Sequence, residues 1–245
     1  MLNLYTPQKF NIPSDLSEIF AEKQKTKIGK MRYNILYISA KPDPSSFDRN
    51  LEATTEFSKK KMSYLMHKGH AVTGAYASSV AEFIETWNAI GKEQLQNINK
   101  VIIDYHGAIS AKRGHQSLIF ITPTELLDKQ YISMLEIKPS VKVVSLYTCY
   151  GGFTERYNPA VGFLEKLKAP DAYTVGFDAQ AENDMLSLKT FRHYDPGKPF
   201  NDALNALNIH RFQLGRVKYS KIDKTEIFIQ HSSGDIRKAL SDYMS

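Results

Sequence analysis

Residues 100–105 read KVIIDY, and short runs of this kind, rich in β-branched and aromatic residues, recur along the chain. The comparable runs are 34–40 (NILYISA), 71–77 (AVTGAYA), 142–148 (KVVSLYT) and 172–177 (AYTVGF). Near-continuous apolar strands that alternate with helical patterns are typical of a parallel sheet covered on both faces. The sequence therefore predicts an α/β fold with a doubly wound, mostly parallel sheet and helices on both faces.

Helix signals lie between these strands. A helical pattern runs over residues 50–68 and ends at Gly69, and the Ser78-Ser79 pair is typical of the start of the next helix. Residues 117–122 indicate a short strand, followed by a helix from Pro123 to about residue 135. Asn158-Pro159 predicts the start of a further helix that reaches residue 167.

The remaining segments indicate one domain with a peripheral arm. Residues 1–30 are polar and lysine-rich, so we expect an N-terminal arm, with residues 31–245 forming the domain. Beyond residue 178 the pattern favours a strand or hairpin over 185–193, a helix over 200–214 and an edge strand over 226–230, followed by a C-terminal helix. No linker rich in Gly, Ser or Pro separates these elements.

Composition excludes several classes of protein. The 245 residues contain one cysteine, Cys149, which rules out an internal disulfide, a cysteine zinc cluster and a CxxC redox pair. The net charge of +6 comes from scattered residues without a nucleic-acid-binding motif, so no nucleic-acid partner is expected. No signal peptide and no apolar run of about 18 residues is present, which predicts a cytoplasmic protein without a membrane span. Export as an effector without a Sec signal stays open, as does the oligomeric state.

Glycine patterns argue against nucleotide binding. No strand is followed by GxGxxG or GxxxxGK[ST], the loops that bind dinucleotide and nucleotide phosphates. A small flavodoxin-like ligand-binding protein remains an alternative, which a bound nucleotide in purified protein would reveal.

Two of the strands are followed by residues with reactive side chains. His106-Gly107 follows the run at 100–105, and Cys149 follows the run at 142–148 and precedes Tyr150-Gly151-Gly152. If these strands are neighbours, His106 and Cys149 meet at the carboxyl edge of the sheet. An imidazole can take the proton of a thiol and later protonate a leaving amine, while the backbone N–H groups of Gly107 and Cys149 are candidate oxyanion donors. Such a dyad needs no metal or cofactor.

Simpler explanations exist for each residue alone. A lone cysteine at a strand end is commonly a small buried apolar residue, and a strand-terminal histidine is commonly structural. The combination, with glycine after each residue, favours a catalytic pair. Asp104 precedes His106 by two and could orient the imidazole, with a structural role as the alternative.

The segment 101–152 resembles the caspase-like (clan CD) cysteine peptidases, most closely the CHAT and clostripain-type branches. The resemblance covers about 52 residues by motif and residues 34–178 by strand order. It implies that Cys149 is the nucleophile, that His106 is the general base, and that Gly107 and the Cys149 amide bind the oxyanion of a peptide substrate. Thr148 stands where many relatives have Ala, and Tyr150 adds an aromatic beside the nucleophile. These departures leave a catalytically inactive caspase-like interaction module, binding a protein partner, as the alternative function.

The resemblance also indicates a substrate pocket. Clostripain-like enzymes that cleave after Arg or Lys use an acidic residue near the end of the strand after the cysteine strand, and Asp178 matches that place. Asp48 lies in the loop after the first strand, which also contributes to the family's pocket, and Tyr150 is a third candidate for substrate contact. Arg49 argues for an acidic preference instead, and capping of a turn is the alternative role of Asp178.

Overall fold

The computed structural model describes residues 2–9, 32–41, 49–110, 116–152, 157–177, 181–183, 191–193, 216–220, 228–230 and 236–238. For residues 49–57, 181–183, 191–193, 216–217, 228–230 and 236–238 the description is limited to the backbone. Within this part of the chain, no helix has both the length and the apolar character needed to cross a membrane.

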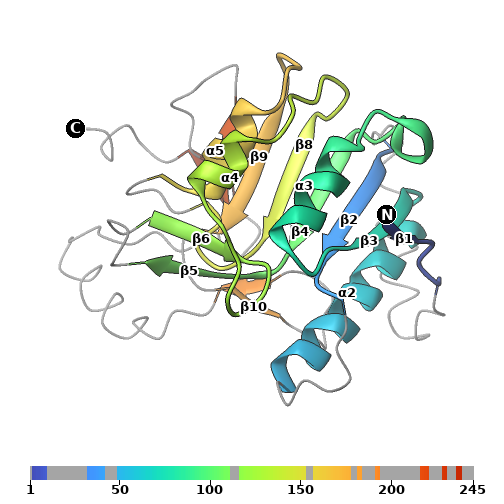
Figure 1. Ribbon diagram of the computed structural model, residues 1–245, viewed down its shortest axis with the longest axis horizontal. Coiled ribbons are helices and arrows are strands. Elements are labelled where there is room, and N and C mark those ends of the chain that lie inside the picture. Colours follow the sequence, from blue (N-terminus) through green and yellow to red (C-terminus); the bar gives the residue numbers. More distant parts are fainter. Residues whose placement is uncertain are drawn as a thin grey trace.

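A mixed sheet forms the centre of the molecule (Figure 1), with strand order β1-β3-β2-β4-β8-β9-β12-β13-β14. Its strands are β1 (Asn3–Tyr5), β2 (Asn34–Ser39), β3 (Ala71–Tyr76), β4 (Lys100–Asp104), β8 (Val143–Tyr147), β9 (Tyr173–Phe177), β12 (Arg216–Ser220), β13 (Phe228–Gln230) and β14 (Ile236–Lys238). The five central strands, β3-β2-β4-β8-β9, are parallel to one another. These are the five strands that the apolar runs predict, and the α/β class is confirmed.

The parallel pairing that the sequence predicts is confined to these five strands, and the described sheet as a whole is mixed. β1 pairs antiparallel with β3 at one edge, and β12, β13 and β14 continue the other edge in antiparallel order. Segments 221–227 and 231–235 join the last three strands, and both are shorter than the dozen or so residues that a parallel crossover needs. These short connections therefore impose antiparallel pairing on β12, β13 and β14.

Helices pack against both faces of the described sheet. Helices α3 (Val80–Asn88), α4 (Lys129–Ser133) and α5 (Pro159–Glu165) cover one face, where their side chains share a core with those of β2, β4 and β8. Helix α2 (Arg49–His67) covers the other face, where Met62 and Leu65 pack on Tyr37 and Ile102. In Figure 1, α3, α4 and α5 lie in front of the sheet.

Side-chain caps explain where two of these helices begin. The hydroxyl of Ser79 accepts the N–H of Glu82 at 3.1 Å, and the Asn158 side chain accepts the N–H of Val161 at 3.0 Å. Each cap satisfies an N–H that has no partner within its own helix. Both predicted helix starts are confirmed.

The segment after β4 differs from the expectation. Strands β5 (His106–Ser110), β6 (Gln116–Phe120) and β7 (Leu126–Leu127) form a separate antiparallel sheet. The helix predicted from Pro123 is wrong in its start, because the Thr122 hydroxyl accepts the N–H of Glu125 at 3.0 Å and stabilises a turn there. Helix α4 begins only at Lys129, where Asp128 accepts the N–H groups of Gln130 and Tyr131.

A further antiparallel strand pair follows β9 among the described residues. β10 (Ala181–Asn183) pairs antiparallel with β11 (Phe191–His193). The predicted strand or hairpin over 185–193 is confirmed for β11, whereas its partner strand lies before that range. β14 lies where the sequence predicts a C-terminal helix, and its pairing with β13 moves the edge of the sheet outward. The helix predicted over 200–214 lies outside the described residues.

Candidate functional site

Strands β4 and β8 bring the two candidate catalytic residues to the same end of the sheet, where the carboxyl ends of the parallel strands lie. The strands are parallel neighbours, and Asp104 pairs with Tyr147 at their carboxyl ends. His106 lies two residues after Asp104, and Cys149 lies two residues after Tyr147. The two segments therefore leave the sheet from paired positions. The expectation that the two strands are neighbours is confirmed.

This end of the sheet includes the point where the chain reverses direction across the sheet. From β2 the chain passes through α2 to β3 on one side, and then through α3 to β4 on the other side. The carboxyl ends of β2 and β4, where Ser39 pairs with Asp104, therefore form a topological switch point. Open α/β sheets bind ligands in the crevice at such points.

Gly107 lies against the backbone of Cys149. A Cβ atom placed on Gly107 would come within 3.1 Å of both the amide nitrogen and the carbonyl carbon of Cys149, and would overlap its carbonyl oxygen. From standard backbone dimensions, the Cα atoms of His106 and Cys149 are separated by no more than about 10 Å. His106 itself is exposed and is the first residue of β5, and Cys149 is partly exposed.

Cys149 lies in a tight turn that begins where β8 ends. The N–H of Gly151 donates to the carbonyl of Thr148 at 3.3 Å, and Tyr150, the third residue of the turn, has a φ of 56°. A positive φ at this place is the pattern of a type II turn, which favours Gly or Asn there. The Ser117 hydroxyl, from β6, donates to the Tyr150 carbonyl at 2.6 Å.

Contacts from three other elements stabilise the glycines after this turn. The N–H of Gly152 donates to Phe177 O of β9 at 2.9 Å, and the N–H of Ala160 in α5 donates to Gly151 O at 2.9 Å. The hydroxyl of Tyr219, on β12, donates to Gly152 O at 2.8 Å. A Cβ on Gly176 would approach the amide nitrogen of Gly152 to 2.5 Å, so the two backbones are in direct contact. The turn therefore has little room to shift.

Thr148 is buried beside the candidate nucleophile. Its side-chain hydroxyl is the one buried side-chain oxygen or nitrogen in the described part of the chain without a hydrogen-bond partner. This hydroxyl faces Gly151, where a Cβ atom would overlap it. A side chain at position 151 would therefore have to displace the Thr148 hydroxyl.

Asp104 is part of a buried hydrogen-bond cluster. Its carboxylate is 3% exposed and accepts the hydroxyls of Tyr37 and Ser58, each at 2.5 Å. Burial raises the pKa of Asp104, while the two hydroxyl donors and the nearby charges of His106 and Lys61 act in the opposite direction. Since these bonds join β4 to β2 and to α2, they favour the structural role of Asp104 over an orienting one.

Sequence patterns did not reveal the partners of this cluster. Tyr37 lies in an apolar strand, and a buried tyrosine hydroxyl normally needs a partner, which was the available signal. Ser58 is a single serine without a local motif, and the same holds for Ser117 beside the turn of Cys149, so nothing in the sequence distinguishes them from other polar positions.

The proposed substrate pocket is only partly described. Tyr150 lies in the turn next to Cys149, whereas Asp48 and Asp178 lie outside the described residues.

Within the described residues, no three metal-ligating side chains come together. His70 has a structural role, since its Nδ1 accepts the N–H of Tyr33 at 3.2 Å.

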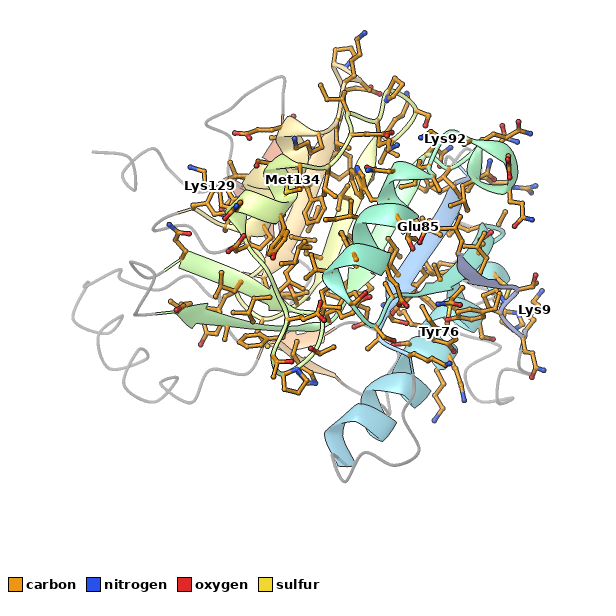
Figure 2. All side chains as sticks on the ribbon, viewed as in Figure 1. Lys9, Tyr76, Glu85, Lys92, Lys129 and Met134 are labelled. Atoms are coloured by element: carbon orange, nitrogen blue, oxygen red, sulfur yellow. The ribbon has the colours of Figure 1, made fainter. Side chains whose placement is uncertain are left out.

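An open depression of about 450 Å³ lies at the other end of the sheet, where the parallel strands begin. It is lined by Ile137, Pro139, Glu165, Leu167 and Lys168, in segments that precede β8 and β9. Exposed apolar side chains lie near α4, where Met134 and Ile137 are each 60% exposed (Met134 is labelled in Figure 2). This depression is at the amino ends of the strands and is separate from the turn of Cys149.

Comparison with known proteins does not add to these observations. No family model matches the chain, and no significant match was found among curated proteins or solved structures.

Proposed function

We propose that the protein is a cysteine endopeptidase of caspase-like fold that hydrolyses peptide bonds through a dyad of Cys149 and His106. The observation that supports this most strongly is the paired ending of β4 and β8, together with the contact between Gly107 and the backbone of Cys149. The five parallel strands have the order 2-1-3-4-5 when numbered along the chain, which is a doubly wound order. A three-layer sandwich of the caspase or flavodoxin kind is the architecture that we propose.

In the first half of the reaction, His106 takes the proton of the Cys149 thiol, and the thiolate attacks the carbonyl carbon of the substrate. The carbonyl oxygen becomes an oxyanion, which accepts hydrogen bonds from the backbone N–H groups of Gly107 and Cys149. When the C–N bond breaks, His106 gives its proton to the leaving amine, and the acyl group stays on the sulfur as a thioester.

In the second half, His106 takes a proton from water as the water attacks the thioester. The C–S bond breaks, the carboxylic acid product leaves, and the thiol form of Cys149 is restored. The two half-reactions use the same base and the same oxyanion donors, so no further catalytic group is needed.

We propose a preference for cleavage after basic residues. Asp178 and Asp48 would bind an Arg or Lys side chain by charge-assisted hydrogen bonds, with Tyr150 at the pocket wall. A panel of fluorogenic peptides with Arg, Lys, Asp or Leu before the scissile bond tests this preference. Turnover confined to the Asp or Leu peptides would contradict it.

The decisive experiment measures the reactivity of Cys149. Because it is the single cysteine, alkylation by iodoacetamide reports on it alone. We expect alkylation at pH 7 to be faster than that of the unfolded chain and to slow in His106→Ala. His67→Ala, at the end of α2, is the matched control and should not change the rate.

Turnover completes the test. Peptide hydrolysis should be lost in Cys149→Ala while the circular dichroism spectrum is retained. Retained hydrolysis in that variant would end the peptidase proposal. A folded wild-type protein without hydrolysis and without an activated thiol would favour the interaction module.

A further inference from the structure

We infer that Ser117 is a positioning residue for Cys149, because its hydroxyl keeps the turn after the nucleophile in a conformation that tyrosine disfavours. The inference rests on the proposed peptidase function and adds a residue from outside the dyad. Three features from different segments support it: the backbone angle at Tyr150 in the turn, the hydrogen bond from Ser117 on β6, and the contact with Gly107 on β5.

The turn contains a residue that does not suit it. Its third position has a φ of 56° but is occupied by Tyr150, whereas this place in a type II turn favours Gly or Asn. A side chain with a Cβ atom is strained in the left-handed region. Such strain persists only when the surrounding structure opposes relaxation, and it is concentrated at functional sites.

Ser117 provides one such restraint. The peptide group after Tyr150 is bonded at both ends: its N–H, from Gly151, donates to Thr148 O, and its carbonyl accepts the Ser117 hydroxyl at 2.6 Å. Ser117 is 1% exposed, and its own N–H donates to the carbonyl of Tyr157 at 3.3 Å. The donor is therefore itself fixed in place.

Gly107 restrains the peptide group before Tyr150. A Cβ at position 107 would overlap the carbonyl oxygen of Cys149, so this carbonyl packs directly against Gly107. The φ and ψ angles of Tyr150 relate the two peptide groups. With one bonded to Ser117 and the other packed on Gly107, the positive φ follows.

The same hairpin supports both members of the dyad. His106 is the first residue of β5. Ser117 is on β6, where it pairs with Ile109 of β5. If Tyr150 relaxed to a negative φ, the peptide group that contains the Cys149 carbonyl would rotate, and the Cys149 side chain would move relative to His106. The hairpin therefore presents the base and restrains the nucleophile at once.

The first test compares Ser117→Thr with Ser117→Val, which have the same shape but differ by a hydroxyl. The readout is the rate constant of Cys149 alkylation by iodoacetamide from pH 5 to 9. We expect the Val variant to react about tenfold more slowly at pH 7. The midpoint of its rate-against-pH curve should move toward the ordinary thiol pKa of about 8.5. Equal rates and midpoints in the two variants would overturn the inference.

Because Ser117 is buried, the added methyl group could hinder folding of both variants. Ser117→Ala against the wild-type protein repeats the comparison without added volume. Circular dichroism confirms folding before each measurement.

The second test introduces Tyr150→Gly, since glycine adopts a positive φ without strain. In this background, the difference between the Thr and Val variants should shrink from about tenfold to less than about threefold. A difference that stays at tenfold would show that Ser117 does not act through the backbone angle at position 150, and would overturn the inference.

Unfolding in urea separates this inference from the proposed function, because it requires no reactive thiol. The unfolding constants of Ser117→Thr and Ser117→Val should differ about tenfold in the Tyr150→Gly background and less than about threefold when Tyr150 is present, because a Tyr150 released from the hydrogen bond relieves its backbone strain and a glycine has no strain to relieve. If wild-type Cys149 alkylates no faster than the unfolded chain, the peptidase proposal fails, and these constants decide the Ser117 inference on their own.

Discussion

Gly107 and Cys149 are in backbone contact, although 41 residues lie between them in the chain. The contact follows from the parallel pairing of β4 and β8, after which both segments turn away from the sheet at the same level. It joins the residue next to the candidate base to the candidate nucleophile itself. The conformation of one segment therefore depends on the other.

Replacing Gly107 by alanine should disrupt this contact. The Cβ atom would overlap the Cys149 carbonyl, so the turn must move, and a displacement of about 1 Å can cost roughly 100-fold in rate. We expect peptide hydrolysis and alkylation at pH 7 to fall to about 1% of wild type, measured with a fluorogenic peptide and iodoacetamide.

Gly91→Ala is the control for this prediction. Gly91 has a φ of 89°, but no atom lies within 4 Å of a Cβ placed there, so the change strains the backbone without creating an overlap. It should lower the free energy of unfolding and leave the reactivity of Cys149 unchanged. Full activity in Gly107→Ala would show that the contact is not needed for the reaction.

Asp104→Asn should change how stability depends on pH. Burial raises the pKa of Asp104 in the folded protein above its value in the unfolded chain. The folded state then binds more protons, so the contribution of Asp104 to stability is present at low pH and is lost as the pH rises through the raised pKa. The Asn variant lacks this loss, and its free energy of unfolding should gain on that of wild type as the pH rises from 4 to 8.

Urea unfolding at several pH values measures this difference. Above the raised pKa the gain should level off, since Asp104 is then ionised in both states. A difference between the two proteins that stays constant across the range would contradict the raised pKa. Asp128→Asn is the comparison for an acidic residue that caps α4.

Gly176→Ala and Gly74→Ala should differ in their cost to stability. A Cβ at Gly176 would meet backbone atoms of Gly151 and Gly152, whereas one at Gly74 would meet the ring of Tyr5 on the edge strand β1. A side chain on an edge strand can move more readily than the hydrogen-bonded backbone of the turn. We expect a loss of about 3 kcal/mol at Gly176 and about 1 kcal/mol at Gly74, from urea unfolding. Equal losses would indicate that the turn at Gly152 adjusts freely.

Asn158 supports both α5 and the turn of the candidate nucleophile. Its side chain caps α5 and also donates to the Tyr219 hydroxyl at 3.0 Å, and that hydroxyl bonds Gly152 O. Asn158→Ala removes both bonds and should cost about 1–2 kcal/mol. Asn158→Asp keeps the cap and should cost less, because a carboxylate is favourable at a helix start.

Thermal unfolding of the two variants tests this order. An aspartate variant as unstable as the alanine variant would show that the bond to Tyr219, and not the cap, accounts for the loss. The comparison thereby separates the two functions of one side chain.

The sequence by itself determined the five parallel strands, the starts of α3 and α5 and the placement of His106 and Cys149 just after the carboxyl ends of two of these strands. These features depend on local patterns: apolar runs of strand length, and caps whose acceptor lies three residues from its donor. Only the tertiary structure decided the β5-β6-β7 sheet, the antiparallel edges and the bonds of Asp104 and Ser117. The Tyr37–Asp104 bond spans 67 positions and the Ser117–Tyr150 bond spans 33, so both depend on how strands pair across the fold, which no local pattern encodes.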